Sequence, residues 1–265
     1  YLAYAIFGLY PFGEESVLCL DLNGQYVYYF EALRDAFWGD GSIFYNWSRN
    51  LSGEFIGIIG YYLASPFTLI VLLLPEKFML SSLLIMQLCK LGAAGVTFSY
   101  FLQKRRNVKP LQSLLFSTMY AMMAYAVIQL IDPMWLDGLV MLPLIMLGIE
   151  YMVDDGRRLN YIIPLAIMCV ANFYIGYMIC IYVALYFLFY LFFGSDRKRK
   201  PYDYAATIVR AIYSSVVALA CAAFMLLPVY YALKLGKFEF TDPDYSFRFQ
   251  SEFGLLDLLP QLLPA

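Results

Sequence analysis

Long apolar stretches separated by short polar connections dominate this chain. Six stretches are apolar for most of their length: 78–102, 111–131, 138–153, 159–172, 174–193 and 208–233. A helix needs about 20 apolar residues to cross a bilayer, and a helix satisfies its own backbone groups in hydrocarbon. The pattern therefore predicts an all-α fold in which six transmembrane helices occupy residues 78–233.

One predicted boundary lies inside a longer uncharged run. Residues 159–194 carry no Asp, Glu, Lys or Arg. At about 1.5 Å per residue, a single helix of this length would exceed the thickness of a bilayer. The run is interrupted by the segment NFYIG at 172–176. We expect a hairpin of two helices that turns at this segment.

The first part of the chain has a different pattern. Residues 1–10 look like the end of a first span, whereas 11–77 mix charges, glycines and aromatic residues. Within this loop, 56–75 is uncharged but broken by the sequence YYLASP, so we interpret it as membrane-surface helices. Residues 234–265 are expected to form an outer segment. Because the chain begins at Tyr1 without a Met, we expect it to be the N-terminal part of a longer protein.

The basic residues favour one orientation in the membrane. Eleven of the 18 bases fall in three polar connections, at 104–109, 157–158 and 197–200, or at Arg210. If the spans alternate, these bases share one side, which the positive-inside rule assigns to the cytoplasm. The sequence thus predicts a multi-pass cell-membrane protein whose long first loop, 11–77, is extracytoplasmic.

Composition narrows the classes of function. Hydrophobic residues make up 62% of the chain and charged residues only 14%, which excludes an ordinary soluble domain. The net charge of −2 provides no positive field that would attract nucleic acid, so no nucleic-acid partner is expected. The expected partner is the lipid bilayer. There is no His, which leaves carboxylates, Lys, Arg and Tyr to carry acid–base chemistry. We interpret the five Cys as structural, since the chain has no CxxC pair.

Side chains suited to binding or catalysis recur in three segments on the predicted outer side. The first loop contributes Asp21, Gln25 and Tyr26, the turn IDPMWLDG contributes Asp132, Trp135 and Asp137, and the bend NFYIGY contributes Asn172 and Tyr174. We expect these segments to meet in one pocket. The alternative is that the acids cap helix starts and the aromatic residues form an ordinary interfacial belt.

Two charged residues have unusual sequence surroundings. Asp21 lies in VLCLDLNGQY, where apolar neighbours would partly desolvate its carboxylate, raise its proton affinity and make it a usable base. Lys90 lies about 18 Å into the 78–102 span by helix rise, close to the bilayer midplane. No acid is expected at that depth in the predicted spans. Lys90 should therefore meet a partner elsewhere in a longer chain, snorkel to the interface, or face a lipid phosphate.

Several segments resemble one known family. They are YPFGEESVLCLDLNGQY, YYLASPF, LCKLGAAG, MWLDGLVMLPLIMLGIE and NFYIGYMICIYVALYFLF. In this order they are similar to the YfhO-type bacterial membrane proteins, which are placed among the polytopic GT-C glycosyltransferases. The resemblance implies a transmembrane helical bundle of GT-C type. It also implies transfer of a sugar from a polyprenyl-phosphate donor to a cell-envelope glycopolymer, such as a teichoic-acid-type polymer, on the outer membrane face.

The same resemblance implies roles for individual residues. GT-C enzymes place an essential acid in the first outer loop, and Asp21 in LDLNGQY is the matching position, so Asp21 would deprotonate the acceptor hydroxyl. Lys90 would stabilise the departing carrier phosphate. Asp21 is followed by Leu22 and Asn23, so a DxD-type metal motif is not evident. No other motif indicates a cofactor, and the need for a divalent metal ion is left open.

Two other functions fit a polytopic membrane protein. One is a transporter or flippase of a lipid-linked sugar. Transporters usually carry repeated halves and several deep carboxylates, whereas this chain shows no internal repeat and only Lys90 deep in a span. The other is a non-catalytic scaffold for envelope enzymes. No pattern in the sequence specifies the sugar, the acceptor or the oligomeric state.

Overall fold

The fold of this chain is known from a computed structural model. It describes residues 5–10, 12–47, 53–195 and 201–236. Residues 1–232 form one compact unit, and most of its described residues are helical. In the described ranges, the strands are limited to the short antiparallel pair β1 (Tyr45–Asn46) and β2 (Gly53–Glu54). The predicted all-α helical bundle is confirmed.

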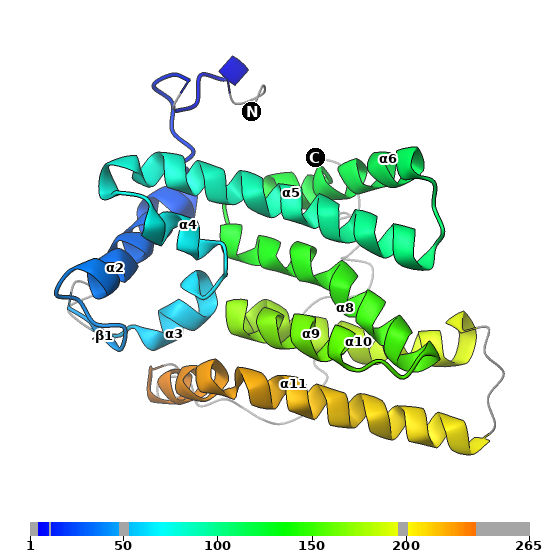
Figure 1. The fold of residues 1–265 in the computed structure, drawn as a ribbon. Helices are drawn as coiled ribbons and strands as arrows, with labels where there is room; N and C mark the ends of the chain where they lie inside the picture. The colour runs from blue at the N-terminus through cyan, green and yellow to red at the C-terminus, as the bar shows by residue number, and fades with distance from the viewer. Residues whose placement is uncertain (1–4, 11, 48–52, 196–200, 237–265) are drawn as a thin grey trace, which may run out of the picture. The chain divides into compact units, whose positions relative to one another are not determined.

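A group of short helices precedes the bundle. It consists of η1 (Leu22–Tyr26), α2 (Val27–Trp38), α3 (Ile56–Ile58), η2 (Ile59–Leu63), α4 (Thr68–Leu73) and η3 (Glu76–Phe78). Helices α2, α3 and α4 lie together at one end of the longer helices (Figure 1). The segment predicted to form surface helices, 56–75, is helical from Ile56 to Leu63 and from Thr68 to Leu73, with a break at 64–67 that contains Pro66. The break follows from Pro66, which lacks the backbone N–H needed to continue a helix.

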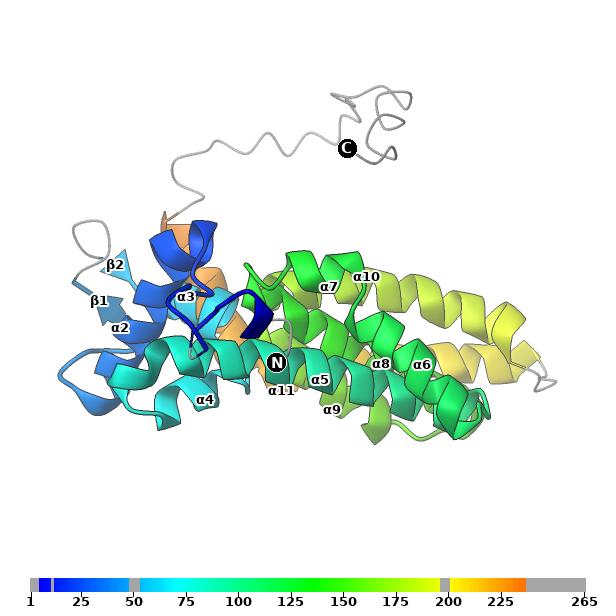
Figure 2. The same cartoon turned by 90° about the horizontal axis from the view of Figure 1, so that it is seen from above.

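The remaining elements build the bundle. They are α5 (Met79–Arg105), α6 (Pro110–Ala121), α7 (Ala124–Ile128), η4 (Pro133–Trp135), α8 (Leu136–Asp154), α9 (Leu159–Ala171), α10 (Phe173–Phe189), η5 (Tyr190–Gly194) and α11 (Pro201–Gly236). The long helices run along a common direction in both views (Figures 1 and 2). Helix α8 packs against α5, α9 and α10, which makes it the central helix of the bundle.

Four helical stretches are long and apolar enough to cross a membrane. They are Glu76–Arg105, Pro133–Asp154, Phe173–Gly194 and Tyr202–Lys234. Each coincides with a predicted span. Helix α9 has only 13 residues, and the stretch predicted at 111–131 is divided into α6 and α7 at Met122 and Met123. The number of crossings therefore stays a prediction, as does the division of the chain into 1–10, 11–77, 78–233 and 234–265.

The predicted hairpin turn is present. Helix α9 ends at Ala171 and α10 begins at Phe173, with Asn172 in an extended conformation between them. The Asn172 Oδ1 atom accepts a hydrogen bond from the Ile175 backbone N–H at 2.9 Å, which caps the start of α10. A single residue thus reverses the chain, because its side chain satisfies one of the backbone donors left free at a helix start.

A glycine sets the close packing of α8 against α9. A Cβ atom built on Gly148 would lie 2.3 Å from the Asn160 carbonyl oxygen and 2.5 Å from the Tyr161 Cα atom. Both of these atoms belong to the α9 backbone, which cannot move aside as a side chain can. Small residues at such positions let two helices approach closely in a membrane.

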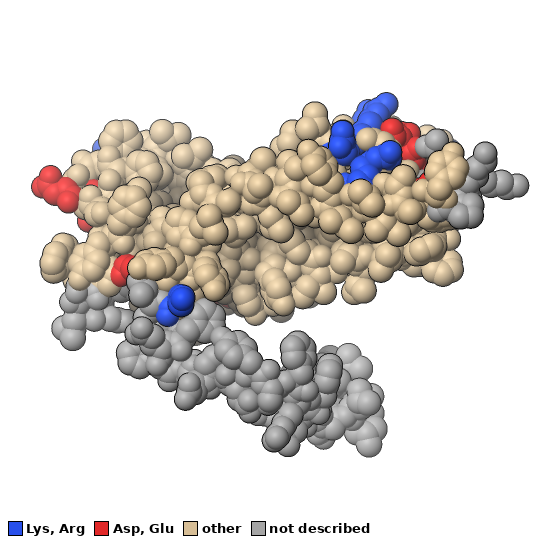
Figure 3. Space-filling view, turned by 90° about the horizontal axis from the view of Figure 1, so that it is seen from below, with Lys and Arg blue, Asp and Glu red and all other residues tan. Residues whose placement is uncertain are grey.

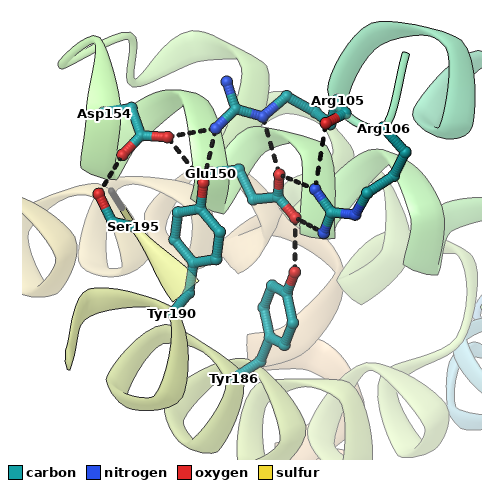
Figure 4. Close-up of polar contacts among 7 residues, drawn as sticks. All are labelled: Arg105, Arg106, Glu150, Asp154, Tyr186, Tyr190 and Ser195. Carbon is teal, nitrogen blue, oxygen red and sulfur yellow. Dashed lines mark hydrogen bonds and ion pairs between the residues drawn. The ribbon is translucent and has the colours of Figure 1, made fainter. Parts of the chain in front are cut away.

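A buried carboxylate links three helices at the end of the bundle where α5 meets α6 and α8 meets α9. We call this end the basic end. Glu150 of α8 is completely buried and accepts hydrogen bonds from Arg105 Nε at 2.8 Å, Arg106 Nη2 at 2.6 Å and the Tyr186 hydroxyl at 2.6 Å (Figure 4). Hydrogen bonding to this carboxylate raises the pKa of Arg106.

One turn further along α8, Asp154 extends this network. Its carboxylate accepts hydrogen bonds from the Tyr190 hydroxyl at 2.7 Å, from the Ser195 hydroxyl at 2.6 Å and from the Arg105 guanidinium (Figure 4). The two acids and two arginines hold α5, α8 and the end of α10 together. Buried charges are tolerated when each is paired and hydrogen-bonded in this way.

Charged side chains are separated into two groups on the face shown in Figure 3. Blue and red side chains lie toward the two ends, and a broad uncharged region lies between them. This distribution is the one expected when the middle of a helical bundle contacts hydrocarbon and its ends contact water and headgroups.

The contact at Gly148 generates a test of the helix packing. We expect Gly148→Ala to lower stability by about 1–3 kcal/mol, because the added methyl group must push the α9 backbone away. The measurement is the melting temperature of the purified protein in detergent. Gly92→Ala is the matched control, since a Cβ there has no atom within 4 Å. Equal melting temperatures for Gly148→Ala and Gly92→Ala would contradict the close approach of α8 and α9.

Candidate functional site

Segments far apart in the sequence meet at the end of the bundle opposite the basic end. The Tyr26 hydroxyl donates to Asp132 Oδ1 at 2.8 Å, which joins the start of α2 to the turn before α8. Trp135 Nε1 donates to the Tyr61 hydroxyl at 3.3 Å, and Asn172 Nδ2 donates to the Tyr61 carbonyl oxygen at 2.8 Å. The three segments predicted to converge do so around η2. We call this end the site end.

Tyr26 lies between two carboxylates. Its side chain is buried, and its hydroxyl is 2.8 Å from Asp132 Oδ1 and 3.4 Å from Asp21 Oδ2. A hydroxyl carries one proton, so the shorter contact identifies Asp132 as the acceptor and leaves Asp21 with a weak contact. Burial, together with the hydrogen bond to Asp132, raises the pKa of Tyr26. Tyr26 therefore stays protonated at neutral pH and acts as a hydrogen-bond donor.

Tyrosine rings form one wall of the site. The Tyr62 ring lies 5.1 Å from the rings of both Tyr26 and Tyr29, and 4.5 Å from the ring of Tyr61. Burial and the neighbouring Tyr29 raise the pKa of Tyr62 to about 12. Gln25 Nε2 donates to the Tyr29 hydroxyl at 2.6 Å. Tyr26 and Tyr62 therefore keep their hydroxyl protons at physiological pH, and the rings of this wall offer flat apolar faces.

The wall continues across the bend between α9 and α10. The Tyr61 ring lies 5.6 Å from Phe173 and 5.8 Å from Tyr174, and its hydroxyl accepts from Trp135. Tyr61 and Tyr62 were not among the site residues expected from the sequence. In the sequence, YYLASPF indicates a break between surface helices and contributes to the family resemblance, but neither observation assigns a site role to its tyrosines. A pair of adjacent tyrosines before such a break is the signal that could have identified them.

The carboxylate of Asp21 is exposed, in contrast to the sequence-based expectation. Asp21 precedes η1, and its side chain is exposed, whereas Leu22 next to it is fully buried. The expected partial desolvation of Asp21 is therefore wrong. Leu22 takes the buried position next to Asp21, whereas Leu20 on its other side is 76% exposed, so only part of this apolar segment faces the core. Asp21, Gln25 and Tyr174 are the predicted site residues whose side chains are exposed at the site end.

Lys90 has a partner within the chain. Its Nζ atom lies 2.7 Å from Asp137 Oδ2 and 2.8 Å from the Pro133 carbonyl oxygen. Asp137 Oδ1 in turn accepts from the Ser65 hydroxyl at 2.7 Å. The exposed fraction is only 1% for Lys90 and 2% for Asp137. The expectation that no acid lies at the depth of Lys90 is therefore wrong.

Depth along α5 alone does not place Lys90 relative to α8, because the two helices are offset along the bundle. Helix α5 begins beyond the start of α8, so the twelfth residue of α5, Lys90, reaches only the first turn of α8. Asp137 lies within this first turn and makes no side-chain cap, contrary to the alternative that it caps a helix start. Because both charges are buried and paired, the geometry favours a role in fixing the break at Ser65 to the bundle.

Asn172 also has a structural place in the site. It is fully buried, and its side chain both caps α10 and donates to the backbone of Tyr61. It thereby connects the α9–α10 bend to η2 and holds Tyr61 against Trp135. The substrate-binding roles predicted for Asn172, Lys90 and Asp137 stay predictions.

The described residues offer no cluster of metal ligands. No three His, Cys, Asp or Glu side chains in the described part of the chain lie close enough together to hold one ion. The exposed side chains of the site are Asp21, Gln25 and Tyr174, and beside them lie the half-buried Asp132 carboxylate and the aromatic surface of Tyr61 and Tyr62. Such a set can accept a proton, donate hydrogen bonds and pack against an uncharged ring.

Comparison with known families gives one match. The family described as bacterial membrane protein YfhO matches this chain over residues 1–265. Comparisons with curated proteins and with solved structures found no match.

The buried pair at the site end generates a stability test. We expect Lys90→Met to destabilise the protein by about 3–5 kcal/mol, because it leaves the Asp137 carboxylate buried without a cation. The double variant Lys90→Met/Asp137→Leu should recover part of this loss, since neither charge then remains. Melting temperatures in detergent measure both effects, with Lys77→Met as the exposed control at the same end. An unchanged melting temperature for Lys90→Met would show that the pair does not stabilise the bundle.

Proposed function

The chain belongs to the YfhO family of bacterial membrane proteins, and on this premise we propose that it is a membrane glycosyltransferase. In this proposal it moves a sugar from a polyprenyl-phosphate carrier to a cell-envelope acceptor, such as a teichoic-acid-type polymer. The reaction takes place at the site end, which faces the extracytoplasmic side. The arrangement of Asp21, Tyr26 and Asp132 beside an aromatic wall is the observation that carries the proposal.

Asp21 acts as the base in this reaction. An exposed carboxylate can approach an acceptor hydroxyl without displacing a strong existing partner, since its contact with Tyr26 is 3.4 Å long. As the acceptor oxygen attacks the anomeric carbon, its proton passes to Asp21. The bond from that carbon to the carrier phosphate breaks, and its electron pair leaves with the phosphate oxygen.

Asp132 and Tyr26 position the base. The 2.8 Å hydrogen bond from the Tyr26 hydroxyl to Asp132 fixes both side chains at the start of α2 and before α8. The same Tyr26 hydroxyl lies 3.4 Å from Asp21 Oδ2, so the two positioned side chains stand beside the base.

Neutral donors stabilise the leaving phosphate in this scheme. Lys90 is buried and paired with Asp137, so its ammonium group does not reach a bound phosphate. The hydroxyl groups of Tyr61 and Tyr62 lie nearer the exposed site, and burial raises the pKa of each phenol. Protonated hydroxyls aimed at a developing negative charge are a recognised source of transition-state stabilisation.

The location of the site suits a lipid-linked donor. Such a donor keeps its isoprenoid tail in hydrocarbon and its phosphate at the interface, so the enzyme needs a polar site at headgroup level. The site end provides one where the apolar helices α5, α8 and α10 begin or pass. The extracytoplasmic assignment is supported by the arginine and lysine clusters at the basic end.

A flippase for a lipid-linked sugar is the second candidate. The buried pair Lys90–Asp137 favours it, because ionisable groups within membrane-spanning helices often mark transport pathways. Lys90 also donates to the Pro133 carbonyl oxygen, and Asp137 lies in the first turn of α8, which suits a fixed structural contact better than a moving one. A non-catalytic envelope scaffold is the third candidate, and it would need none of the exposed carboxylates.

Sugar transfer can be measured directly. The intact protein is reconstituted into liposomes with a polyprenyl-phosphate donor carrying a labelled sugar, and label in the acceptor polymer is counted. We expect Asp21→Asn to reduce transfer by about 100-fold or more, as loss of a general base does. Tyr26→Phe should cause a smaller loss, because it removes only the hydrogen bond to Asp132. Asp40→Asn, an exposed acid in the same loop, is the control and should transfer normally.

Three outcomes decide among the candidates. Normal transfer by Asp21→Asn would remove Asp21 from the mechanism. Movement of the carrier across the bilayer without any sugar transfer would support the flippase. Absence of both activities from the wild-type protein, with its expected fold retained, would support the scaffold.

A further inference from the structure

A hollow lies among α8, α9, α10 and α11, away from the site end. Its volume is about 430 Å³. Its walls are hydrocarbon from all four helices, including Met152, Leu165, Val183 and Ile212. Helices α8, α10 and α11 belong to stretches long and apolar enough to cross a membrane. The hollow is therefore placed within the part of the protein that the bilayer surrounds.

The hydroxyl groups inside the hollow are already satisfied. The Tyr161 hydroxyl and Ser215 Oγ lie 2.7 Å apart, and Ser215 Oγ also donates to the Ala211 carbonyl oxygen at 2.9 Å. Ordered water needs two to four polar partners to remain in a cavity, and a hollow without free polar groups does not supply them. The chemistry of the lining thus selects an apolar occupant.

The hollow opens onto an apolar surface. Leu188, Ile212, Val216 and Leu219 line it, and their exposed fractions are 45%, 59%, 58% and 40%. In a bilayer, exposed leucine, isoleucine and valine side chains on long helices contact lipid chains. The opening therefore gives access from hydrocarbon, and a lipid chain can enter without crossing a polar barrier.

The hollow extends from the basic end toward the middle of the bundle, as an acyl chain of a lipid in that leaflet does. Its lining on α11 runs from Ile208 to Leu219, about 16 Å along the helix. Arg210 lies level with the beginning of this lining, and its Nη1 atom would be 3.3 Å from a Cβ on Gly156. The turn between α8 and α9 thus marks the polar end of the hollow, and the lining extends from there toward the middle of α11.

Guanidinium groups that make no ion pair with any carboxylate of the described residues lie at this level. Arg158 Cζ is 5.5 Å from the ring centre of Tyr213, and Arg157 Cζ is 5.6 Å from that of Tyr151. Among the ion pairs of the described residues, none involves Arg157, Arg158 or Arg210. This contrasts with Arg105 and Arg106, which are neutralised by buried acids. Unneutralised bases at headgroup level attract anionic lipids.

We propose that the hollow binds an acyl chain of an anionic phospholipid from the leaflet at the basic end. The headgroup lies at the level of Arg158 and Arg210, and the chain lies along α11 between α10 and α11. The apolar lining of the hollow favours an acyl chain. The arginines at its polar end, which make no ion pair among the described residues, favour an anionic headgroup. This lipid site is separate from the sugar-transfer site and does not depend on it.

Lipid retention tests the proposal. The intact protein is placed in nanodiscs of equal parts phosphatidylglycerol and phosphatidylcholine, and lipids kept after release are identified by native mass spectrometry. We expect wild-type protein to retain a phosphatidylglycerol, and Ala184→Trp, which fills the hollow, to retain about tenfold less. Ala220→Trp is the matched control, because Ala220 is exposed on α11 but does not line the hollow.

A second pair of variants tests the headgroup. Replacing both Arg158 and Arg210 with Gln should lower the preference for phosphatidylglycerol over phosphatidylcholine by roughly tenfold. Lys104→Gln, an exposed base at the same end, should leave the preference much less affected. If Ala184→Trp fails to fold, Val216→Trp blocks the hollow from its other wall. Retention by the blocked variants equal to wild type, an unaltered headgroup preference, or no retained lipid in wild type would overturn the proposal.

Discussion

Two buried ion pairs join the central helix α8 to α5, one toward each end of α8. Asp137 in the first turn binds Lys90, and Glu150 binds Arg105. The acids are separated by 13 residues, about 20 Å of helix. A charge removed from water must keep its partner, because breaking a buried pair is strongly destabilising. With two such pairs so far apart, α8 can neither slide along α5 nor rotate against it without exposing or isolating a charge.

The site end depends on this fixed register. Asp132 and Trp135 lie immediately before α8, so the position of α8 sets where they meet Tyr26 and Tyr61. Asp137 also binds Ser65, which fixes the break in the preceding loop to the same point. The candidate site is therefore held at the ends of packed helices, although much of its sequence lies in loops. A geometry of this kind is what positioned acid–base chemistry requires.

The two ends of the bundle differ in which charged groups are exposed and which are paired. At the site end the exposed groups include carboxylates and phenols, and the buried Lys90 is paired with Asp137. At the basic end, buried acids neutralise Arg105 and Arg106, whereas Arg158 and Arg210 make no ion pair among the described residues. The first arrangement suits uncharged hydroxyl-bearing ligands, and the second suits anionic headgroups.

The sequence by itself determined the helices and the bends between them. Apolar length and the absence of charge are local properties, so they located the long helices and the reversal at Asn172 correctly. They also identified the segments that meet at the site end, because chain reversals alternate between the two ends of a bundle. The division of 111–131 at Met122 did not follow from this pattern, since the residues there are as apolar as their neighbours.

Only the tertiary structure decided which side chains meet and which are exposed. Lys90 and Asp137 are 47 residues apart, and their contact depends on how far α5 extends beyond α8, which neither helix encodes alone. Tyr61 became part of the site because Asn172 and Trp135 both reach it from other elements. Asp21 is exposed because Leu22 takes the buried position beside it. The hydrophobic pattern of the sequence determines where each helix forms. The partners and the exposure of a side chain depend on how far one helix is offset from its neighbour, and packing determines that offset.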